Sequence, residues 1–427
     1  MNYNSDCSCL LFTAISLATT GGAGAQDWPQ WRGPDRDGHA AAFEAPDQWP
    51  EALSQHWSVE VGDGVATPAL VGDRLYVFTL QEDKEFIRCL NVATGETIWS
   101  DSYEAQGADG PARSFAGPRS SPAVGEGRVV TLGVRGTVSC LDAATGQVVW
   151  RKDDFASWPR FFTSCSPVIA DGRCFVQLGA EGESQGAIVA YDLNTGDEAW
   201  RWSGDGTAYG SPMLMTLENR TLLVAETARK LVFLDAARGE LRWEMPSEVR
   251  GRGYNTITPI VHDGTVMLSG AGRGTRAMAV QVRDGEIAGD ELWVNEQHSI
   301  MFNSPILKGD GVYGLSDANA LFCINASTGA TAWTTPVTGP EAPEQGEGDR
   351  GRRRRGGGGF GSIVDGGEVL MALTPRAELI VFRPDLSAYS EIRRYKVASS
   401  ETHAYPVLSG RRIVIKDRDS VTLWTVD

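Results

Sequence analysis

The chain has 427 residues, of which 41% are hydrophobic, so it has enough apolar content for a large folded core. Its formal net charge is -16 at pH 7. A charge of this sign and size argues against nucleic acid and anionic membrane surfaces as main partners.

Residues 1–25 are typical of a signal peptide. A short apolar core at 10–18 precedes a small-residue cleavage site at 23–25. The apolar run is too short to span a bilayer as a helix. Cleavage would remove one acidic group, Asp6, and change the charge from -16 to -15. We therefore expect an exported protein, periplasmic or secreted, without a transmembrane segment; the alternative interpretation is a disordered tail.

Residues 26–54 form a Pro- and Gly-rich segment with Trp28 and Trp31 near its start. Two tryptophans in such a segment need a surface to cover them. We expect this segment to pack on the following domain as an N-terminal strap. The alternative is that its tryptophans stack on a sugar, as in a carbohydrate-binding protein.

A short phrase recurs along the chain, and its period predicts the architecture. Each copy has an apolar or Cys residue, an Asp or Asn, a turn that ends in Gly, and a Trp four residues later. The glycines of the five copies are Gly95, Gly146, Gly196, Gly239 and Gly329, and the first four are 51, 50 and 43 residues apart. Self-similarity at a fixed period of this length indicates a radial repeat.

A second signal begins each repeat: a Ser-Pro or Thr-Pro pair, or a degenerate form of it. Short β-rich runs with Gly and Asp turns follow each pair, which gives four strands per repeat. This pattern predicts an all-β, eight-bladed β-propeller of four-stranded antiparallel blades over residues 55–427. The starts lie near residues 67, 121, 166, 211, 258, 304, 362 and 405. Seven blades is the alternative, if the degenerate seventh and eighth starts are misread.

The two ends of the propeller region are complementary. Residues 55–61 form a lone strand with a Trp, whereas the chain from residue 405 supplies three strands and stops. Joining the N-terminal strand to the last three would complete a blade, close the ring and remove exposed strand edges.

The recurring phrase resembles the tryptophan-docking motif of the quinoprotein (PQQ-like) β-propeller family, over about residues 55–427. Among secreted bacterial members, the size and architecture are similar to those of BamB, the propeller lipoprotein of the outer-membrane β-barrel assembly machine. A structural role in the layer between blades is expected for the phrase's tryptophans, Trp99, Trp150, Trp200, Trp243 and Trp333. The motif is specific for the fold and not for an activity.

Three stretches depart from the repeat. The fifth repeat has its Trp293 eight residues after Gly285, and the seventh has no Trp, with Tyr395 as a candidate substitute. Residues 339–361 hold four consecutive Arg and four consecutive Gly, and this composition predicts a disordered surface loop.

The sequence offers little support for catalysis. It has no CxxC, HExxH or GxSxG motif and only five His, so we expect no metal site and no catalytic residue. Quinoprotein dehydrogenases of the family hold PQQ against a disulfide of adjacent cysteines, with calcium beside it, and this chain has no Cys-Cys pair. We therefore expect no cofactor and leave PQQ with calcium as the alternative.

Cys165 and Cys174 flank one hairpin, but its turn would not place them opposite each other, so we expect no disulfide.

Residues just before the Ser/Thr-Pro starts should lie at one mouth of the axial channel. Several are aromatic or polar, a combination that suits a small ligand or a peptide tip. The alternative is that they only plug the channel. The candidate ligand-binding residues are Arg119, Tyr209, Tyr254, Asn255, Asn303 and His403.

Together these features predict a monomeric, non-enzymatic propeller in the bacterial envelope. It would act as a binding or scaffold module for an unidentified protein partner or small ligand. The alternatives are a PQQ-dependent periplasmic oxidoreductase and a carbohydrate-binding propeller.

Overall fold

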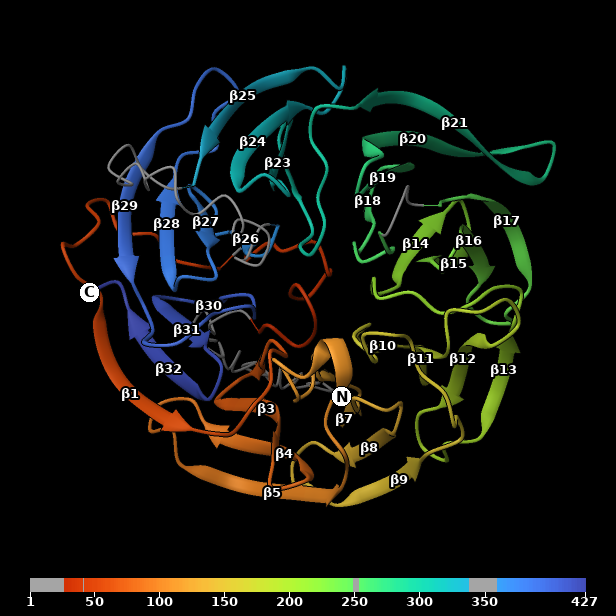
Figure 1. The fold of residues 1–427 in the computed structure, drawn as a ribbon, viewed down its shortest axis with the longest axis horizontal. Helices are drawn as coiled ribbons and strands as arrows, with labels where there is room; N and C mark the ends of the chain where they lie inside the picture. The colour runs from red at the N-terminus through yellow and green to blue at the C-terminus, as the bar shows by residue number, and fades with distance from the viewer. Residues whose placement is uncertain (1–26, 41, 249–252, 338–358) are drawn as a thin grey trace, which may run out of the picture.

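The computed structural model describes residues 27–40, 42–248, 253–337 and 359–427. The chain forms eight four-stranded antiparallel sheets arranged as blades around a central axis (Figure 1). The predicted eight-bladed β-propeller is therefore confirmed, and the seven-bladed alternative is wrong. The predicted signal peptide and most of the predicted loop at 339–361 lie outside the described residues.

Each blade runs from an inner strand near the axis to an outer strand at the rim. The first four blades are β2 (Ala69–Val71), β3 (Arg74–Gln81), β4 (Lys84–Asn91) and β5 (Thr97–Glu104); β6 (Ala123–Gly125), β7 (Arg128–Leu132), β8 (Val138–Asp142) and β9 (Val148–Lys152); β10 (Val168–Ala170), β11 (Arg173–Gly179), β12 (Gly186–Asp192) and β13 (Glu198–Trp202); and β14 (Met213–Leu217), β15 (Arg220–Glu226), β16 (Lys230–Asp235) and β17 (Leu241–Pro246). The last four are β18 (Ile260–His262), β19 (Thr265–Gly270), β20 (Gly274–Arg283) and β21 (Glu286–Asn295); β22 (Ile306–Lys308), β23 (Gly311–Leu315), β24 (Ala320–Asn325) and β25 (Thr331–Pro336); β26 (Ser362–Asp365), β27 (Leu370–Leu373), β28 (Glu378–Phe382) and β29 (Glu391–Lys396); and β30 (Val407–Ser409), β31 (Arg412–Lys416), β32 (Ser420–Thr425) and β1 (Ser54–Glu60).

The ring closes through blade 8, as the sequence predicts. Strand β1 pairs antiparallel with β32, with Trp57 opposite Leu423 and Glu60 opposite Ser420. The last blade thus combines one N-terminal and three C-terminal strands. This pairing satisfies the backbone groups that a three-stranded final blade would leave exposed.

The Gly of each repeated turn lies beneath a tryptophan of the preceding blade. Gly146 has φ +74°, and a Cβ added to it would lie 2.4 Å from Cε3 of Trp99. Gly is therefore required both by the left-handed backbone and by the close approach of the indole. Trp99 Nε1 also donates a hydrogen bond to the Ala143 carbonyl of that turn, at 3.2 Å. The tryptophan thus joins one blade to the next.

The same donation from an indole to a carbonyl recurs around the ring. It joins Trp57 to Val92, Trp150 to Leu193, Trp200 to Ala236, Trp293 to Ala326 and Trp333 to Asp385.

The irregular repeats have physical explanations. Blade 5 replaces the tight turn with the long β20–β21 hairpin, and Trp243 of blade 4 packs over Gly289 within it. In blade 7 the register places Arg393 where the other blades have Trp, whereas Tyr395 donates a hydrogen bond to the Pro50 carbonyl at 2.7 Å. Tyr395 is therefore not the substitute that the sequence suggested. No turn joins β32 to β1, so blade 8 offers no Gly for an indole of blade 7 to cover.

Side-chain hydroxyls of the blade starts form a closed ring of hydrogen bonds around the axis. The backbone N–H of one start donates to the hydroxyl of the next, beginning with Thr67 to Ser121 at 3.1 Å and Ser121 to Ser166 at 3.0 Å. The ring continues through Ser211, Thr258 and Ser304. It then passes over blade 7, because the Tyr405 hydroxyl accepts from Ser304 N and Tyr405 N donates to Thr67 Oγ1, each at 2.8 Å. The hydroxyls of these starts therefore hold neighbouring blades together.

The segment preceding β1, residues 27–40 and 42–53 and here called the strap, crosses one end of the axial channel and contacts every blade. Trp28 is fully buried against blade 1, and the Arg32 and Arg36 side chains are buried near the axis. Its polar partners, from blade 1 to blade 8, are Leu70, Val124, Ser166 and Pro167, Pro212, Thr258, Pro305, Asp365 and Gly410. The strap therefore ties together the two ends of the chain and all the blades between them.

The five cysteines in the part of the chain that the structure describes are buried free thiols. The β10–β11 register pairs Cys174 with Ile169, so Cys165 is not opposite it. No helix within the described ranges is long and apolar enough to cross a membrane.

Candidate functional site at the mouth of the axial channel

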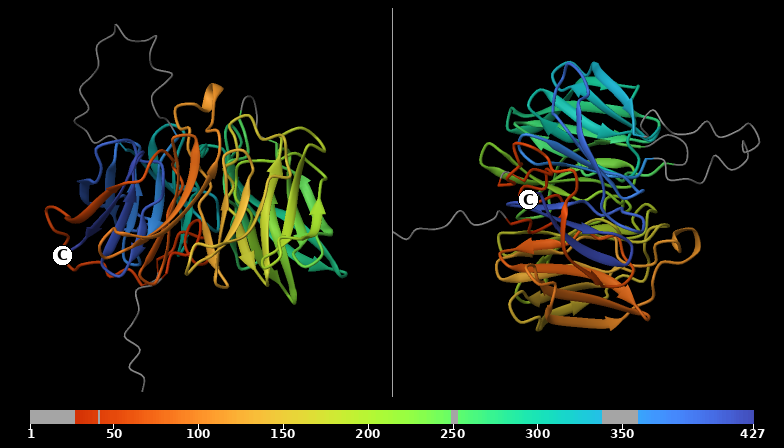
Figure 2. Two further views of the ribbon diagram at one scale, coloured as in Figure 1. Left: turned by 90° about the horizontal axis from the view of Figure 1, so that it is seen from below. Right: turned by 90° about the vertical axis from the view of Figure 1, so that its left-hand side faces the viewer.

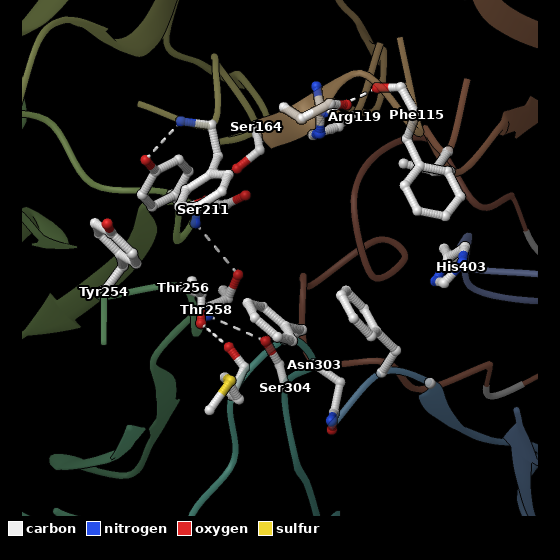
Figure 3. A pocket seen from close by; sticks show the side chains of 18 of the residues that line it. Phe115, Arg119, Ser164, Ser211, Tyr254, Thr256, Thr258, Asn303, Ser304 and His403 are labelled. Atoms are coloured by element: carbon white, nitrogen blue, oxygen red, sulfur yellow. Dashed lines mark hydrogen bonds between the residues drawn. The ribbon is translucent and has the colours of Figure 1, made fainter. Parts of the chain in front are cut away.

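The end of the channel opposite the strap contains a cavity of about 510 Å³ (Figure 3). The strap contacts carbonyls within and just after the blade starts, whereas the cavity is lined mainly by residues at and before them. The short helix η1 (Gly110–Ala112) projects from the cavity's face of the ring (Figure 2). The channel is thus closed at one end and hollow at the other, here called the mouth.

One position of the repeat lines the cavity in every blade: the residue two places before the blade start. In chain order these residues are Val65, Arg119, Ser164, Tyr209, Thr256, Phe302, Phe360 and His403. Successive side chains of an extended backbone point to opposite sides, so this position and those two residues away face the axis. The sequence predicted that residues before the starts build the mouth, and the structure shows which position before each start lines the cavity.

Five of the six predicted ligand-binding residues line the cavity, namely Arg119, Tyr209, Tyr254, Asn303 and His403. Asn255 does not, and its prediction as a mouth residue is wrong. It lies one residue from Tyr254 on an extended segment, so its side chain points the other way. Its Nδ2 donates to the carbonyls of Thr227 at 2.8 Å and Ser247 at 2.7 Å.

Two aromatic walls line the mouth. On one side Phe161, Tyr209 and Tyr254 pack edge to face or tilted, with ring centroids 5.3–6.3 Å apart. On the other, Phe302 stacks on Phe360 at 4.3 Å. Phe302 remains 40% exposed, although it belongs to this wall. Aromatic rings presented in this way can bind an apolar or flat group.

The second wall continues through His403, which lies between Phe360 and Phe115. Its ring meets both phenylalanines edge-on, at centroid distances of 5.1 and 4.5 Å. Burial lowers the pKa of His403, an effect that the nearby Glu401 only partly opposes. The imidazole is therefore neutral at pH 7 and acts as part of the aromatic wall.

The floor of the cavity comes from the strap and the last blade. Trp31 donates from Nε1 to Thr258 Oγ1 at 2.8 Å and meets Tyr405 edge-on at 4.6 Å. Sequence reasoning treated Trp31 only as a packing or sugar-stacking residue and did not place it in the channel. It also missed Phe115, Phe161 and Phe360; the position two residues before the seventh start would have identified Phe360.

Arg119 is the one charged side chain among the described residues that line the cavity, since His403 is neutral. Its Nη2 donates to the carbonyls of Phe115 at 2.7 Å and Ala112 at 3.3 Å. Its Nη1 is buried and has no hydrogen-bond partner among the described residues. Burial lowers the pKa of Arg119 to about 10, so the guanidinium still carries its charge at neutral pH.

Tyr209 and Asn303 form hydrogen bonds within the walls, whereas Asn303 Oδ1 and His403 Nε2 are buried without a hydrogen-bond partner among the described residues. The Tyr209 hydroxyl donates to Glu181 and accepts from Phe161 N at 3.0 Å, and burial together with Glu181 raises its pKa. Asn303 Nδ2 donates to the carbonyls of Leu315 and Gly359 at 2.9 and 3.2 Å. These contacts hold the walls in place and leave no nucleophile paired with a base.

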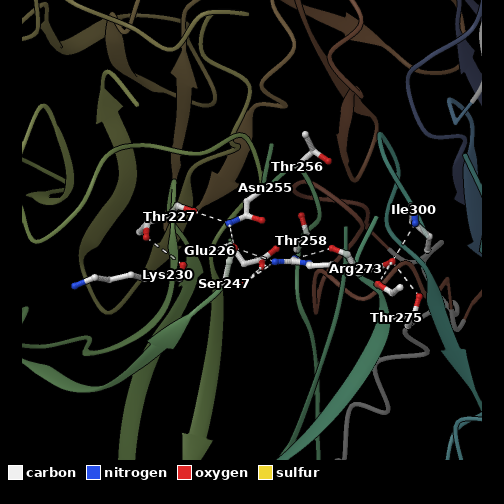
Figure 4. A network of polar contacts seen from close by, with 12 residues as sticks. Glu226, Thr227, Lys230, Ser247, Asn255, Thr256, Thr258, Arg273, Thr275 and Ile300 are labelled. Atoms are coloured by element: carbon white, nitrogen blue, oxygen red, sulfur yellow. Dashed lines mark hydrogen bonds and ion pairs between the residues drawn. The ribbon is translucent and has the colours of Figure 1, made fainter. Parts of the chain in front are cut away.

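A buried polar network between blades 4 and 5 lies outside the cavity (Figure 4). Arg273 Nη2 donates to Glu226 Oε1 at 2.6 Å, and Ser247 Oγ donates to the same oxygen at 2.6 Å. Arg273 Nη1 also donates to Ser247 Oγ at 2.7 Å. Asn255 joins through the Ser247 carbonyl, so its role is to support the wall that carries Tyr254.

The lining does not fit calcium with a quinone. The described lining residues contain no Asp, no Glu and no Cys, so they supply neither carboxylate ligands for calcium nor a disulfide. No group of three or more metal-ligating side chains gathers elsewhere in the described ranges. What the described lining offers is aromatic surface, one guanidinium, a few hydroxyls, the Asn303 amide and the His403 imidazole.

Comparison with protein families gives one match that covers more than half of the chain. Residues 83–335 match the family described as outer membrane protein assembly factor BamB.

Two curated relatives illustrate the range of similar proteins. A quinohemoprotein alcohol dehydrogenase of Comamonas testosteroni is 29% identical over 153 residues, which cover 35% of this chain and 21% of the relative. The outer membrane protein assembly factor BamB of Burkholderia pseudomallei is 26% identical over 262 residues, covering 51% of this chain and 64% of the relative. Each match thus spans less than two thirds of the relative's own length.

Among solved structures, BamB from Moraxella catarrhalis superposes with a TM-score of 0.61 at 16% identity. The match covers 88% of this chain and 98% of that one. At this level of identity the similarity shows the fold and nothing further.

Proposed function

The chain belongs to the family described as outer membrane protein assembly factor BamB, and we propose that it is a non-enzymatic propeller that binds a partner at the mouth of its axial channel. The observation that carries the proposal is the lining of the mouth: two aromatic walls and one arginine, with no carboxylate among the described residues that line it. Such a surface can recognise a ligand but holds no acid–base pair for chemistry. The site of action would be the bacterial envelope or its exterior, reached through the signal peptide predicted at residues 1–25.

The enzymatic alternative is a PQQ-dependent oxidoreductase, and the dehydrogenase relatives are the reason to test it. Calorimetric titration of the purified protein with PQQ, with and without calcium, tests whether the protein binds this cofactor. We expect no calcium-dependent heat, because the described lining supplies no carboxylate for the ion. Calcium-dependent binding at micromolar or lower concentration would overturn the non-enzymatic proposal.

The carbohydrate-binding alternative depended on Trp28 and Trp31. Trp28 is fully buried between the strap and blade 1, and the Trp31 indole is bonded to Thr258 at the floor of the cavity. Neither ring is displayed on the outer surface, so the structure gives no specific support for sugar stacking by this pair.

Binding at the mouth can be tested by photo-crosslinking in the native host. A photoreactive residue placed at the exposed Ser114, which lines the mouth, should give a discrete adduct. The control position is Val149 on the outer strand β9, which is 38% exposed and far from the mouth in the fold. An adduct from Val149 but not from Ser114 would contradict the proposed site.

A further inference from the structure

The lining of the mouth also indicates the chemical class of its ligand. We infer that the cavity binds a flat apolar ring that carries a single negative charge. This inference rests on the proposed function and goes beyond it, because binding at the mouth could hold for a ligand of any charge.

The size and aromatic lining of the cavity favour a ligand with a flat ring. The walls formed by Phe161, Tyr209 and Tyr254 and by Phe302 and Phe360 both line the cavity. The cavity volume of about 510 Å³ suits a small molecule or one large side group. Aromatic walls stabilise an inserted ring through offset and edge-to-face contacts.

The charge of the lining selects the sign of the ligand. Aromatic cages commonly hold cations through the faces of their rings. Here Arg119 places a positive charge in the wall, and the described lining has no carboxylate; the nearby Asp63 acts on this charge but does not line the cavity. A cationic ligand would therefore be repelled, whereas an anionic group would offset the charge.

Arg119 also has hydrogen-bonding capacity to spare. Its Nη2 is engaged by the carbonyls of Phe115 and Ala112, but its Nη1 is buried without a partner among the described residues. A buried unpaired donor is costly, and an anionic oxygen that reached it would form a charge-assisted hydrogen bond. A small rotation of the side chain toward the cavity would be needed, since Nη1 has almost no exposed surface.

The described lining holds a single arginine, which sets the number of charges. A second anionic group on the ligand would find no second cation in the described lining, whose other polar groups are hydroxyls, the Asn303 amide and the neutral His403 imidazole. Burying it unpaired would cost more than it gained. PQQ carries several carboxylates, so it is a poor match even without the requirement for calcium.

The test compares two fluorescent probes with similar rings, the anion 1-anilinonaphthalene-8-sulfonate and the uncharged N-phenyl-1-naphthylamine. Wild-type protein should bind the sulfonate more tightly than the neutral probe. Arg119→Gln should weaken the sulfonate roughly tenfold and leave the neutral probe unchanged, because only the charged hydrogen bond is lost. Phe302→Ala should weaken both probes.

Two further variants make the result decisive. Leu292→Ala removes the exposed apolar side chain of β21 at the rim and should affect neither probe. Arg119→Lys keeps the charge and should retain part of the preference for the sulfonate, with circular dichroism showing that each variant is folded.

Three results would overturn the inference. Loss of sulfonate binding in Leu292→Ala rather than Phe302→Ala would place the probe at the rim. Equal binding of both probes by wild-type protein would refute the selection for negative charge. Binding of neither probe would refute an aromatic ligand, while crosslinking from Ser114 and the PQQ titration would still report on the proposed function itself.

Discussion

The two ends of the axial channel both place an arginine near the axis, but in opposite surroundings. At the strap end, Arg36 donates from all three of its nitrogens, to Ser166, Pro167 and Pro212 carbonyls and to Gln30. At the mouth, Arg119 leaves Nη1 unpaired beside a cavity. Arg32 also has unpaired nitrogens, but it is 1% exposed and lines no described cavity. The comparison separates an arginine that holds blades together from one available to a ligand.

The largest expected effect comes from replacing the saturated arginine. Arg36→Ala would leave three buried carbonyls of blades 3 and 4 without their donor, at roughly 1–2 kcal/mol each, and so lower the free energy of unfolding by roughly 3–6 kcal/mol. Chemical denaturation followed by tryptophan fluorescence measures the change.

The matched control is Arg119→Gln. It should lower the free energy of unfolding by only about 1 kcal/mol, because the two loop carbonyls that Arg119 bonds lie near the open mouth. Equal losses for the two variants would show that both ends of the channel have the same structural role.

Tyr405 belongs both to the ring of hydrogen bonds that joins the blades and to the floor of the mouth. Tyr405→Phe removes the hydroxyl that accepts from Ser304 N in the ring of hydrogen bonds, while it keeps the aromatic floor of the mouth. Unfolding free energy should fall by about 1–3 kcal/mol, the cost of one buried unsatisfied donor. Binding of the fluorescent probes should not change; if it changed more than stability did, the hydroxyl would belong to the ligand site.

The histidines at the two ends should give pH dependences of opposite sign. At the strap end, burial disfavours the protonated form of His39. The Asp365 hydrogen bond and the Asp37 charge outweigh burial and the nearby Lys308, so the pKa of His39 is raised above 6.5. Its stabilisation is fully present below pH 6.5 and is lost as the pH rises through the folded pKa. The unfolding midpoint of wild-type protein should fall as the pH rises across this range, and that of His39→Gln should change less. The same dependence of the midpoint on pH in both proteins would refute the His39 contribution.

At the mouth the shift is reversed. Burial lowers the pKa of His403 below 6.5, so the neutral form is favoured in the folded state. Stability should therefore decrease as the pH falls below 6.5 and stop decreasing once the folded pKa is passed. His403→Phe keeps an aromatic ring between Phe115 and Phe360 and should remove this acid-side loss, as thermal unfolding between pH 7 and 5 would show.

The repeat made the fold predictable, because one phrase specified the turn, its Gly and the Trp of five of the eight blades. The site was predictable only in part. The sequence located the mouth before the blade starts, but it grouped Tyr254 with Asn255, which alternate between the cavity and the interior. Trp31 could not be placed because the path of a strap depends on tertiary contacts, and Phe115 lies in a loop outside the repeat.

Amide hydrogen exchange, with and without 1-anilinonaphthalene-8-sulfonate, tests the contrast between the two ends most directly. Strap amides bonded to blades, those of Ala40 and Glu44, should exchange slowly in both states. Peptides around Ser114 and Phe302 should exchange faster in the free protein and become protected when the probe binds. Rapid exchange of the strap in the free protein, or probe protection at the strap instead of the mouth, would contradict the account.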